Sequence, residues 1–353
     1  MVDSKGECKV FLESRVSGGE GFTKRGESGI VGDDFGKDSA MRHLLTLEDW
    51  PREQIAEAIA MAREVKAHPA KYADSLRGKT LCMIFEKPSL RTRLSFETGM
   101  TQLGGHAIYY DTSRSPLGAG KESIGDTMQT MCRYVDIIMA RLFKHEDLLE
   151  MAKYATVPLI NALTNYSHPG QIIADLQTVE EHLGRLEGLK IAYFGDAFNN
   201  VTHSLMFACP KMGMHLVVAC PEGAEYEPDP AVLASAQKFA AAAGVPLEVV
   251  HDAAEAARGA DVLYTDSWMS YHIPPEQKEA RVAKFSPYRV TEELLGLAKP
   301  SAVFLNCLPA IRGMEQTAGV IDGPQSVVFD EAENRMHVHK ALMLLLLREA
   351  GRI

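Results

Sequence analysis

Short runs of β-branched and aromatic residues alternate along the chain with longer segments in which apolar residues recur at helical spacing. Such runs predict strands, and the segments between them predict helices. We expect strands at Thr80–Phe85, Ala107–Tyr110, Asp136–Ala140, Val157–Ile160, Lys190–Phe194, His215–Ala219, Leu247–Val250, Val262–Thr265 and Ala302–Leu305. The expected helices include Arg91–Leu103, Ser123–Tyr134, Ile172–Leu183, Val201–Met212 and Pro230–Ala243.

Regular alternation of strands and helices predicts an α/β fold with parallel sheets covered on both faces. So many strands exceed one comfortable open sheet, so we expect two doubly wound domains, residues 41–167 and 168–329, with the active site in the cleft between them. The apolar stretch Leu342–Leu347 is too short to span a membrane. It predicts a buried helix within residues 330–353, which we expect to pack back on the first domain.

Residues 1–40 are rich in glycine, serine and alternating charges, with few apolar residues in sequence. Such a segment cannot bury enough surface to offset its ordering entropy, so we expect a disordered tail that ends at Met41. The segment lacks the apolar core of a secretory signal. Its acidic residues also fit a mitochondrial presequence poorly.

The formal net charge of -10 argues against a nucleic-acid or anionic-membrane partner. None of the six cysteines has C-x-x-C spacing, which argues against a structural zinc site. Scattered cysteines in a chain of this size indicate reduced thiols, and we therefore expect a cytoplasmic location.

Polar clusters follow six of the predicted strands, where open parallel sheets bind their ligands. They comprise Glu86–Arg93, Arg141, His168–Gln171, Gly195–Asn200, Asp266–Ser270 and Asn306–Pro309. A nicotinamide oxidoreductase would carry G-x-G-x-x-G after a strand, whereas Gly195–Asn200 offers a single glycine.

The first cluster predicts an anion site. Pro88 ends the strand, Ser89 suits the N-cap of the next helix, and free N–H groups there favour a phosphate. Thr92 adds a hydroxyl donor. Arg91 and Arg93 point to different faces, so we expect one to bind the phosphate and the other to pair with a carboxylate such as Glu86 or Glu97.

Two further sets of residues have chemistry suited to a carbonyl group and an amine. His168, Gln171 and Arg141 together can polarise a carbonyl oxygen and hold an amide. Asp266 and Cys307, paired across a cleft, would hold and desolvate an ammonium group.

These motifs resemble the aspartate/ornithine carbamoyltransferase family over about residues 41–350. The family patterns S-T-R-T-R, H-P-x-Q, D-x-W-x-S-M-G, F-x-H-C-L-P and the C-terminal signature correspond to Ser89–Arg93, His168–Gln171, Asp266–His272, Phe304–Pro309 and Phe329–His337. The resemblance implies transfer of the carbamoyl group of carbamoyl phosphate to the δ-amine of L-ornithine, giving L-citrulline and phosphate in arginine metabolism. It implies no metal and no organic cofactor.

The resemblance also implies roles for single residues. The carbamoyl-phosphate site would comprise Ser89, Leu90, Arg91, Thr92, Arg141, His168, Gln171, Cys307, Leu308 and Arg335. Residues 41–167 would form the donor domain and residues 168–329 the amino-acid domain, with Asn200, Asp266, Ser270 and Tyr271 binding ornithine. The catalytic groups would be Arg141, His168, Asp266 and Cys307. Lys121 lies in the loop that family members pass to a neighbouring subunit, which implies a homotrimer or a multiple of trimers.

Three departures from the family pattern concern the second substrate and the shared loop. Tyr271 and His272 replace the Met-Gly of S-M-G, and Asn306 replaces the histidine before Cys307. The glutamine expected in the loop before Lys121 is absent, and Pro116 and Leu117 stand nearby instead. Putrescine, lysine or an acylated ornithine therefore remain alternative acceptors. A carbamoyltransferase-like subunit that only binds or regulates is a lower alternative, because the arginine, histidine and cysteine set is intact.

Arg91→Ala is expected to remove most of the affinity for carbamoyl phosphate, since a bidentate cation to the phosphate is lost. Calorimetric titration of the donor measures this. Unchanged donor affinity in Arg91→Ala would contradict the phosphate assignment.

Overall fold

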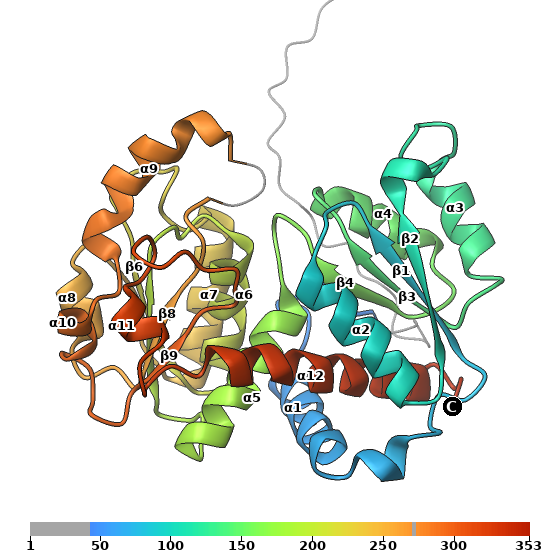
Figure 1. Cartoon of the computed structure of the whole chain (residues 1–353), viewed down its shortest axis with the longest axis horizontal. Coiled ribbons are helices and arrows are strands. Elements are labelled where there is room, and N and C mark those ends of the chain that lie inside the picture. Colours follow the sequence, from blue (N-terminus) through green and yellow to red (C-terminus); the bar gives the residue numbers. More distant parts are fainter. Residues whose placement is uncertain (1–42, 270–272) are drawn as a thin grey trace, which may run out of the picture. The chain divides into compact units, whose positions relative to one another are not determined.

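The computed structural model describes residues 43–269 and 273–353 (Figure 1). The predicted tail and Met41 lie outside these residues, as do Ser270, Tyr271 and His272. The described residues form two parallel sheets. The first has the strand order β2-β1-β3-β4 and the second the order β7-β6-β5-β8-β9.

The strands of the first sheet are β1 (Thr80–Phe85), β2 (His106–Asp111), β3 (Ile137–Arg141) and β4 (Leu159–Leu163). Those of the second are β5 (Lys190–Phe194), β6 (His215–Ala219), β7 (Leu247–Val250), β8 (Val262–Thr265) and β9 (Val303–Leu305). The predicted α/β class and the succession of strands are confirmed. The residues of β1, β3, β5, β6 and β8 are buried almost throughout, as expected for parallel strands covered on both faces.

Helices cover both sheets. Those of the first half are α1 (Arg52–Ala67), α2 (Leu90–Gln102), α3 (Ile124–Met131), α4 (His145–Tyr154) and α5 (Pro169–Leu183). Those that follow are α6 (Asn200–Lys211), α7 (Pro230–Ala243), α8 (Ala253–Ala257), α9 (Lys278–Phe285), α10 (Glu292–Leu295), α11 (Ala318–Ile321) and α12 (Val328–Glu349).

Three predicted elements have a boundary that differs from the structure by more than one residue, namely β4, α5 and α3. Strand β4 starts later than Val157 and continues to Leu163, because the buried Asn161 side chain satisfies the backbone around it. Its Nδ2 donates to the carbonyl oxygen of Leu45 and its Oδ1 accepts from the N–H of Leu163. Helix α5 already begins at Pro169, since proline suits the first helical position.

Helix α3 is shorter than the predicted Ser123–Tyr134. Ser123 caps it by accepting the N–H of Asp126 at 3.0 Å, but the helix ends at Met131. The N–H groups of Tyr134 and Val135 then turn back onto the Met131 carbonyl oxygen. This turn delivers the chain to the start of β3.

One apolar cluster runs through both halves. It includes Met139 of β3, Ile172 of α5, Leu344 of α12, Phe207 of α6 and Leu216 of β6. Helix α12 starts close to β9 and runs along α5, α1 and α2 (Figure 1). The predicted terminal helix thus exists and packs on the first half, and its Leu342–Leu347 segment is buried.

Each sheet reverses its strand order at one point, where ligands of doubly wound folds bind. In the first sheet that point lies between β1 and β3, and in the second between β5 and β8. The loop after β1 leads to Ser89, and Arg141 is the last residue of β3. In the second sheet, Asp266 directly follows β8. The polar clusters of the two halves therefore lie at the two reversal points.

Two carboxyl groups of α5 lie close to α12, of which Asp175 is buried and Glu181 is partly exposed. Near the start of α5, burial raises the pKa of Asp175 from 3.8 to about 7, although hydrogen bonds with Gln171 and Glu331 oppose the rise. Two turns further on, burial also disfavours the Glu181 carboxylate. Hydrogen bonds from Lys66 and Asn334 nevertheless bring the Glu181 pKa below its ordinary value. One helix thus carries two carboxyl groups with opposite pKa shifts.

Asp175→Asn and Glu181→Gln should change the pH dependence of stability in opposite directions. Folded Asp175 keeps its proton to about pH 7, whereas the unfolded chain releases it near pH 4. Its stabilisation is therefore present at low pH and is lost as the pH rises through 7. That of Glu181 is present above its unfolded pKa and is lost as the pH falls.

Thermal unfolding of the two variants and the wild type, followed by circular dichroism from about pH 4 to pH 8, measures these differences. The Tm of wild type minus that of Asp175→Asn should fall as the pH rises. The corresponding difference for Glu181→Gln should increase from its value at the acidic end. Parallel Tm profiles for all three proteins would contradict both pKa shifts.

Candidate active site

The first turn of α2 presents an anion-binding surface. Ser89 has the extended backbone of an N-cap, and its hydroxyl accepts the N–H of Thr92 at 3.3 Å. Leu90, the first residue of the helix, is exposed, and the N–H groups of a first helical turn have no acceptor within the helix. The helix dipole and these donors favour a negatively charged ligand. The predicted N-cap is therefore confirmed.

Two arginines from distant parts of the chain converge on the Thr92 hydroxyl. Arg141 Nη1 donates to Thr92 Oγ1 at 3.3 Å, and Arg335 Nη2 donates to the same oxygen at 2.9 Å. A hydroxyl has two acceptor lone pairs and one donor hydrogen. Because both lone pairs are occupied, the Thr92 O–H is left to donate to a ligand.

Two cations near the start of α2, Arg335 and Lys87, are buried, and burial together with neighbouring positive charges lowers their pKa values. Burial, together with Arg91 nearby, lowers the pKa of Arg335 to about 10, although Cys307 acts in the opposite direction. Burial and then Arg141 lower the pKa of Lys87 to about 8. Cations that crowd together away from water gain stability when an anion binds among them. This chain, with an overall net charge of -10, thus holds a local positive site.

Arg91 and Arg93 lie in different surroundings. Arg93 Nε donates to Glu97 Oε2 at 3.1 Å, and its guanidinium lies 4.1 Å from the centre of the Tyr109 ring. Arg91 instead contributes to lowering the pKa of the buried His168, so its charge faces the cation cluster. Of the two expected carboxylate partners, Glu97 is confirmed as the partner of Arg93.

His168 and Gln171 bring unpaired polar atoms to the same place. His168 is the N-cap of α5, and its backbone N–H donates to Ser204 Oγ at 2.9 Å. Burial, followed by Arg335 and Arg141, lowers the pKa of His168 well below its ordinary value, so the imidazole is neutral. His168 Nδ1, Gln171 Oε1 and Arg335 Nε are buried with no hydrogen-bond partner among the described residues. Buried polar atoms in this state indicate a site for a polar ligand.

Asp266 and Cys307 form a direct contact in the second half. The Cys307 thiol donates to Asp266 Oδ1 at 3.1 Å. They follow β8 and β9, which are neighbouring parallel strands, so they lie side by side on one sheet edge. The expectation that they face each other across a cleft was wrong in this respect. Burial, followed by Asp266, raises the pKa of the Cys307 thiol well above its ordinary value and keeps it protonated.

Asn306, one of the departures from the family pattern, has a structural role. It is fully buried, its Nδ2 donates to Gln316 Oε1 at 3.1 Å, and its Oδ1 accepts the N–H of Leu308 at 2.8 Å. Leu308 adopts a φ of 54°, a region that non-glycine residues rarely occupy, and precedes a cis peptide bond to Pro309. Both ends of the Asn306 amide are thus used to hold this turn.

The loop after β5 positions the first residues of α6. Asn200, a predicted acceptor-binding residue, donates from Nδ2 to the carbonyl oxygen of Thr164 at 2.6 Å, which ties α6 to the segment before His168. Asp196 forms a buried ion pair with Arg281 and accepts the N–H of Phe198 at 3.0 Å. Asp196 therefore organises the loop.

Lys121 is not brought to this group of residues by any contact of the described chain. It is exposed, in the segment between β2 and α3. Ser270, Tyr271 and His272, which include two predicted acceptor-binding residues, lie outside the described residues.

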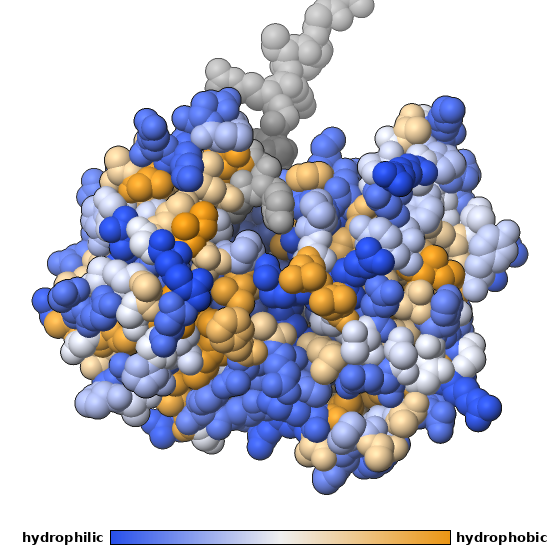
Figure 2. All heavy atoms as spheres, viewed as in Figure 1, coloured by the Kyte–Doolittle hydropathy of each residue, from blue (hydrophilic) through white to orange (hydrophobic). Residues whose placement is uncertain are grey.

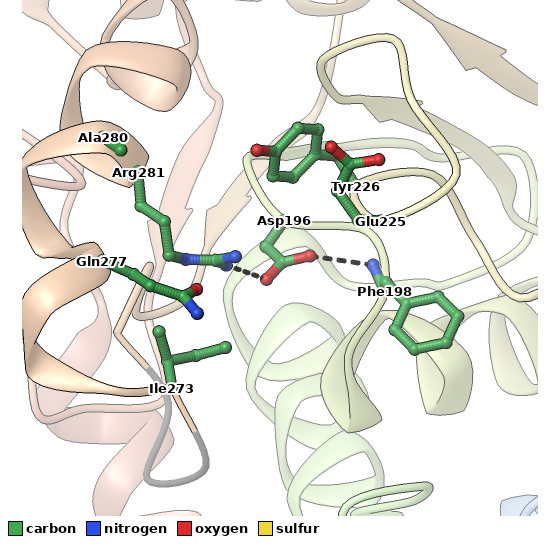
Figure 3. Close-up of a pocket in the computed structure, with 8 residues that line it drawn as sticks. All are labelled: Asp196, Phe198, Glu225, Tyr226, Ile273, Gln277, Ala280 and Arg281. Carbon is green, nitrogen blue, oxygen red and sulfur yellow. Dashed lines mark hydrogen bonds and ion pairs between the residues drawn. The ribbon is translucent and has the colours of Figure 1, made fainter.

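A cavity of about 380 Å³ lies in the second half (Figure 3). The Asp196–Arg281 ion pair forms one wall, and Phe198, Glu225, Tyr226 and Gln277 also line it. No donor-site residue named above borders this cavity. It is therefore distinct from the anion site at the start of α2.

Sequence reasoning missed two carboxyl groups next to the donor site. Gln171 Nε2 donates to Asp175 Oδ1 at 2.8 Å and to Glu331 Oε1 at 3.0 Å. Asp175 was detectable, because residues four apart share a helix face. Glu331 belongs to the C-terminal motif, but 160 residues separate it from Gln171, so no local sequence pattern indicates their contact.

Two further searches concern metals and membranes. Across residues 43–269 and 273–353, no three or more His, Cys, Asp or Glu side chains are grouped so as to hold a metal ion. No helix of this part of the chain has the length and apolar character needed to cross a membrane.

Comparison with known proteins matches two family models to successive parts of the chain. The family model described as the aspartate/ornithine carbamoyltransferase carbamoyl-P binding domain matches residues 42–181. The model of the Asp/Orn binding domain of the same family matches residues 187–346.

Individual relatives match over most of their length. An ornithine carbamoyltransferase of Thermococcus kodakarensis is 49% identical over 310 residues, which cover 87% of this chain and 97% of the relative. The solved ornithine carbamoyltransferase of Pyrococcus furiosus is 47% identical, with a TM-score of 0.82, and the match covers 86% of this chain and 96% of that one. A solved N-acetyl-L-ornithine transcarbamylase mutant is 32% identical, with a TM-score of 0.78, over 86% of this chain and 99% of that one. With an arginine-lined anion site at one sheet reversal and a carboxylate–thiol pair at the other, this chain belongs to the aspartate/ornithine carbamoyltransferase family.

Proposed function

We propose that this chain transfers the carbamoyl group of carbamoyl phosphate to the δ-amine of L-ornithine, giving L-citrulline and phosphate as a step of arginine synthesis in the cytoplasm. The convergence of Arg141 and Arg335 on Thr92, beside neutral His168, is the observation that best supports the donor. The identity of about half of all aligned residues with proteins named ornithine carbamoyltransferase supports the acceptor.

The donor is a dianion attached to an activated carbonyl group. In this proposal Ser89, Leu90, Arg91 and the free N–H groups of α2 bind the phosphate, together with Thr92 and Arg335. Arg141 and the neutral His168 donate to the carbonyl oxygen as it gains negative charge. Gln171 Oε1, a buried acceptor without a partner among the described residues, would accept a hydrogen from the carbamoyl nitrogen.

The reaction exchanges one bond at the carbonyl carbon for another. The δ-nitrogen forms a bond to this carbon, the bond from carbon to the phosphate oxygen breaks, and phosphate leaves with the electron pair. The amine loses one proton, which the departing phosphate can accept. Positioning of the two reactants then supplies much of the rate.

The acceptor would be held by groups of the second half. Asp266 and Cys307 form a hydrogen-bonded pair from which the carboxylate can bind the amine and the thiol can pack against it. Asn200, Ser270 and Tyr271 would bind the amino-acid end, and the Leu308 carbonyl would complete the donor site. Residues 41–167, with the last helix, would thus bind the donor and residues 168–329 the acceptor.

We also propose a homotrimer or a multiple of trimers. Apolar side chains gather at the start of α2 and on the edge strand β2, where Leu90, Leu94 and Ile108 are 70%, 53% and 42% exposed. Figure 2 shows apolar surface over the start of α2. Such a patch beside an unpaired strand edge suits a subunit contact. The exposed Lys121 would then reach the donor site of the neighbouring subunit.

The rate should report the protonation state of the acceptor. An alkylammonium of pKa about 10.4 is almost fully protonated at neutral pH, so kcat/KM is expected to rise with pH between about 6 and 8.5. His168 does not account for this rise, since its pKa is already far below this range. An acceptor with a less basic amine, such as γ-fluoro-ornithine, should shift the rise to lower pH. A flat profile, or one that does not move with the acceptor, would contradict attack by a free amine.

A panel of amines tests the acceptor. Carbamoyl phosphate is incubated with ornithine, N-acetylornithine, lysine or putrescine, and the ureido products are scored. We expect kcat/KM for ornithine to exceed that for putrescine by at least about 100-fold, because putrescine lacks the α-amino and carboxylate groups. Preference for another amine would replace ornithine as acceptor. No product with any amine would favour the non-catalytic alternative.

A further inference from the structure

Gln171 uses both hydrogens of its side-chain amide on two buried carboxyl groups. Nε2 donates to Asp175 Oδ1 at 2.8 Å and to Glu331 Oε1 at 3.0 Å. All three side chains are at most 2% exposed. The amide oxygen of Gln171 is then left without a hydrogen-bond partner among the described residues.

The remaining oxygens of the two carboxyl groups are also occupied. Tyr264 O–H donates to Asp175 Oδ2 at 3.0 Å, and the N–H of Asn306 donates to Glu331 Oε2 at 3.0 Å. The pair therefore connects α5, α12, β8 and the segment that leads from β9 to Cys307. Because four structural elements hold it, the position of this pair is fixed relative to the site.

The two carboxyl groups also contact each other, so they share a proton. Burial raises the pKa of Glu331 well above its ordinary value, and the hydrogen bond with Asp175 raises it further. The groups that face the pair are Arg335 on α12, Tyr264 on β8, Asp266 and Cys307 at the sheet edge, and Cys209 on α6. With one shared proton the pair carries a single negative charge, which offsets the Arg335 guanidinium.

Hydrogen bonding to the two carboxyl groups determines that the nitrogen end of the Gln171 amide, and not its oxygen end, faces them. The oxygen and nitrogen ends of this group are nearly equal in size, so shape alone does not select one. With the amide reversed, its oxygen would lie against two carboxyl oxygens. The observed orientation therefore leaves an acceptor, Oε1, available to a ligand.

We propose that Asp175 and Glu331 are positioning residues that fix the Gln171 amide, so that the site selects a carbamoyl donor over an acyl phosphate with a methyl group in place of the amide nitrogen. This inference rests on the proposed function, in which Gln171 binds the carbamoyl nitrogen. An amide nitrogen offers a hydrogen to Oε1, whereas a methyl group would leave this buried oxygen without a partner. Discrimination of this kind depends on the unpaired group more than on the size of the pocket.

Two stable ligands isolate this contact. Phosphonoacetamide carries the phosphonate, carbonyl and amide groups, and phosphonoacetone has a methyl group in place of the amide nitrogen. Calorimetric titration of the full chain at pH 7 gives the ratio of their Kd values. We expect wild type to bind phosphonoacetamide about 10-fold more tightly.

Variants of the carboxyl pair then test whether this pair causes the preference for phosphonoacetamide over phosphonoacetone. In Asp175→Leu/Glu331→Met the amide loses both acceptors, and the ratio should fall to within about twofold of unity. Asp175→Asn should retain the preference, since its oxygen still accepts from Gln171 and its N–H replaces the shared proton. Glu181→Gln is the matched control: Gln177 on α5 donates to Glu181 at 2.8 Å, in contact with the same helix α12 but away from the site. It should keep the wild-type ratio.

A purely structural role would weaken both ligands alike and leave the ratio unchanged. A wild-type ratio in the double variant, or an equal loss in Glu181→Gln, would overturn the inference. If the double variant does not fold, Asp175→Leu alone should lower the ratio at least about threefold, and an unchanged ratio there would also overturn it. If wild type binds neither ligand, the proposed donor site fails; if wild type binds both equally, the role of Gln171 and this inference fail together.

Discussion

Positive charge is concentrated at the start of α2, where Arg335 and Lys87 are buried and the Asp175–Glu331 pair offsets part of the charge. Arg141 and Arg335 meet on one hydroxyl, and Lys87 lies close enough for Arg141 to lower its pKa. Buried like charges are costly, so the surrounding elements must hold them against their repulsion. β1, β3 and α12 provide that framework, and an anionic ligand would relieve the repulsion.

The same constraint explains why His168 is neutral. Arginines on two sides and complete burial make a charged imidazole unfavourable, so His168 can donate an N–H without adding to the positive charge. The groups of this site that hold a proton are instead acidic side chains. The Cys307 thiol stays protonated, and Asp175 and Glu331 share a proton beneath Gln171. Near neutral pH, His168 therefore stays neutral and Cys307 stays protonated, whereas Asp175, with a pKa of about 7, and Lys87, with a pKa of about 8, change charge in this range.

Local features of the site were predictable from sequence because short-range chemistry determines them. Ser89 caps a helix in its own segment, Arg93 pairs with Glu97 one turn away, and the buried strands have uninterrupted apolar runs. Contacts between distant segments were not predictable in this way. Nothing near Asp266 indicates that Cys307 will lie beside it, because β9 could have paired elsewhere. Likewise, Asn306 departs from the family pattern at a position where the structure requires a buried amide to hold the Leu308 turn, which only its partner Gln316 reveals.

Helix α12 has a consequence for how the protein is made. It packs on α1, α2 and α5, and its Arg335 completes the anion site, yet a ribosome produces it after every other described element. The first half therefore leaves the ribosome with its apolar surface incomplete and waits until some 150 further residues have been added. Domains usually fold in the order of their synthesis. Here the half that is made first cannot finish folding first, so chaperone binding is expected to be concentrated on its uncovered helices during translation.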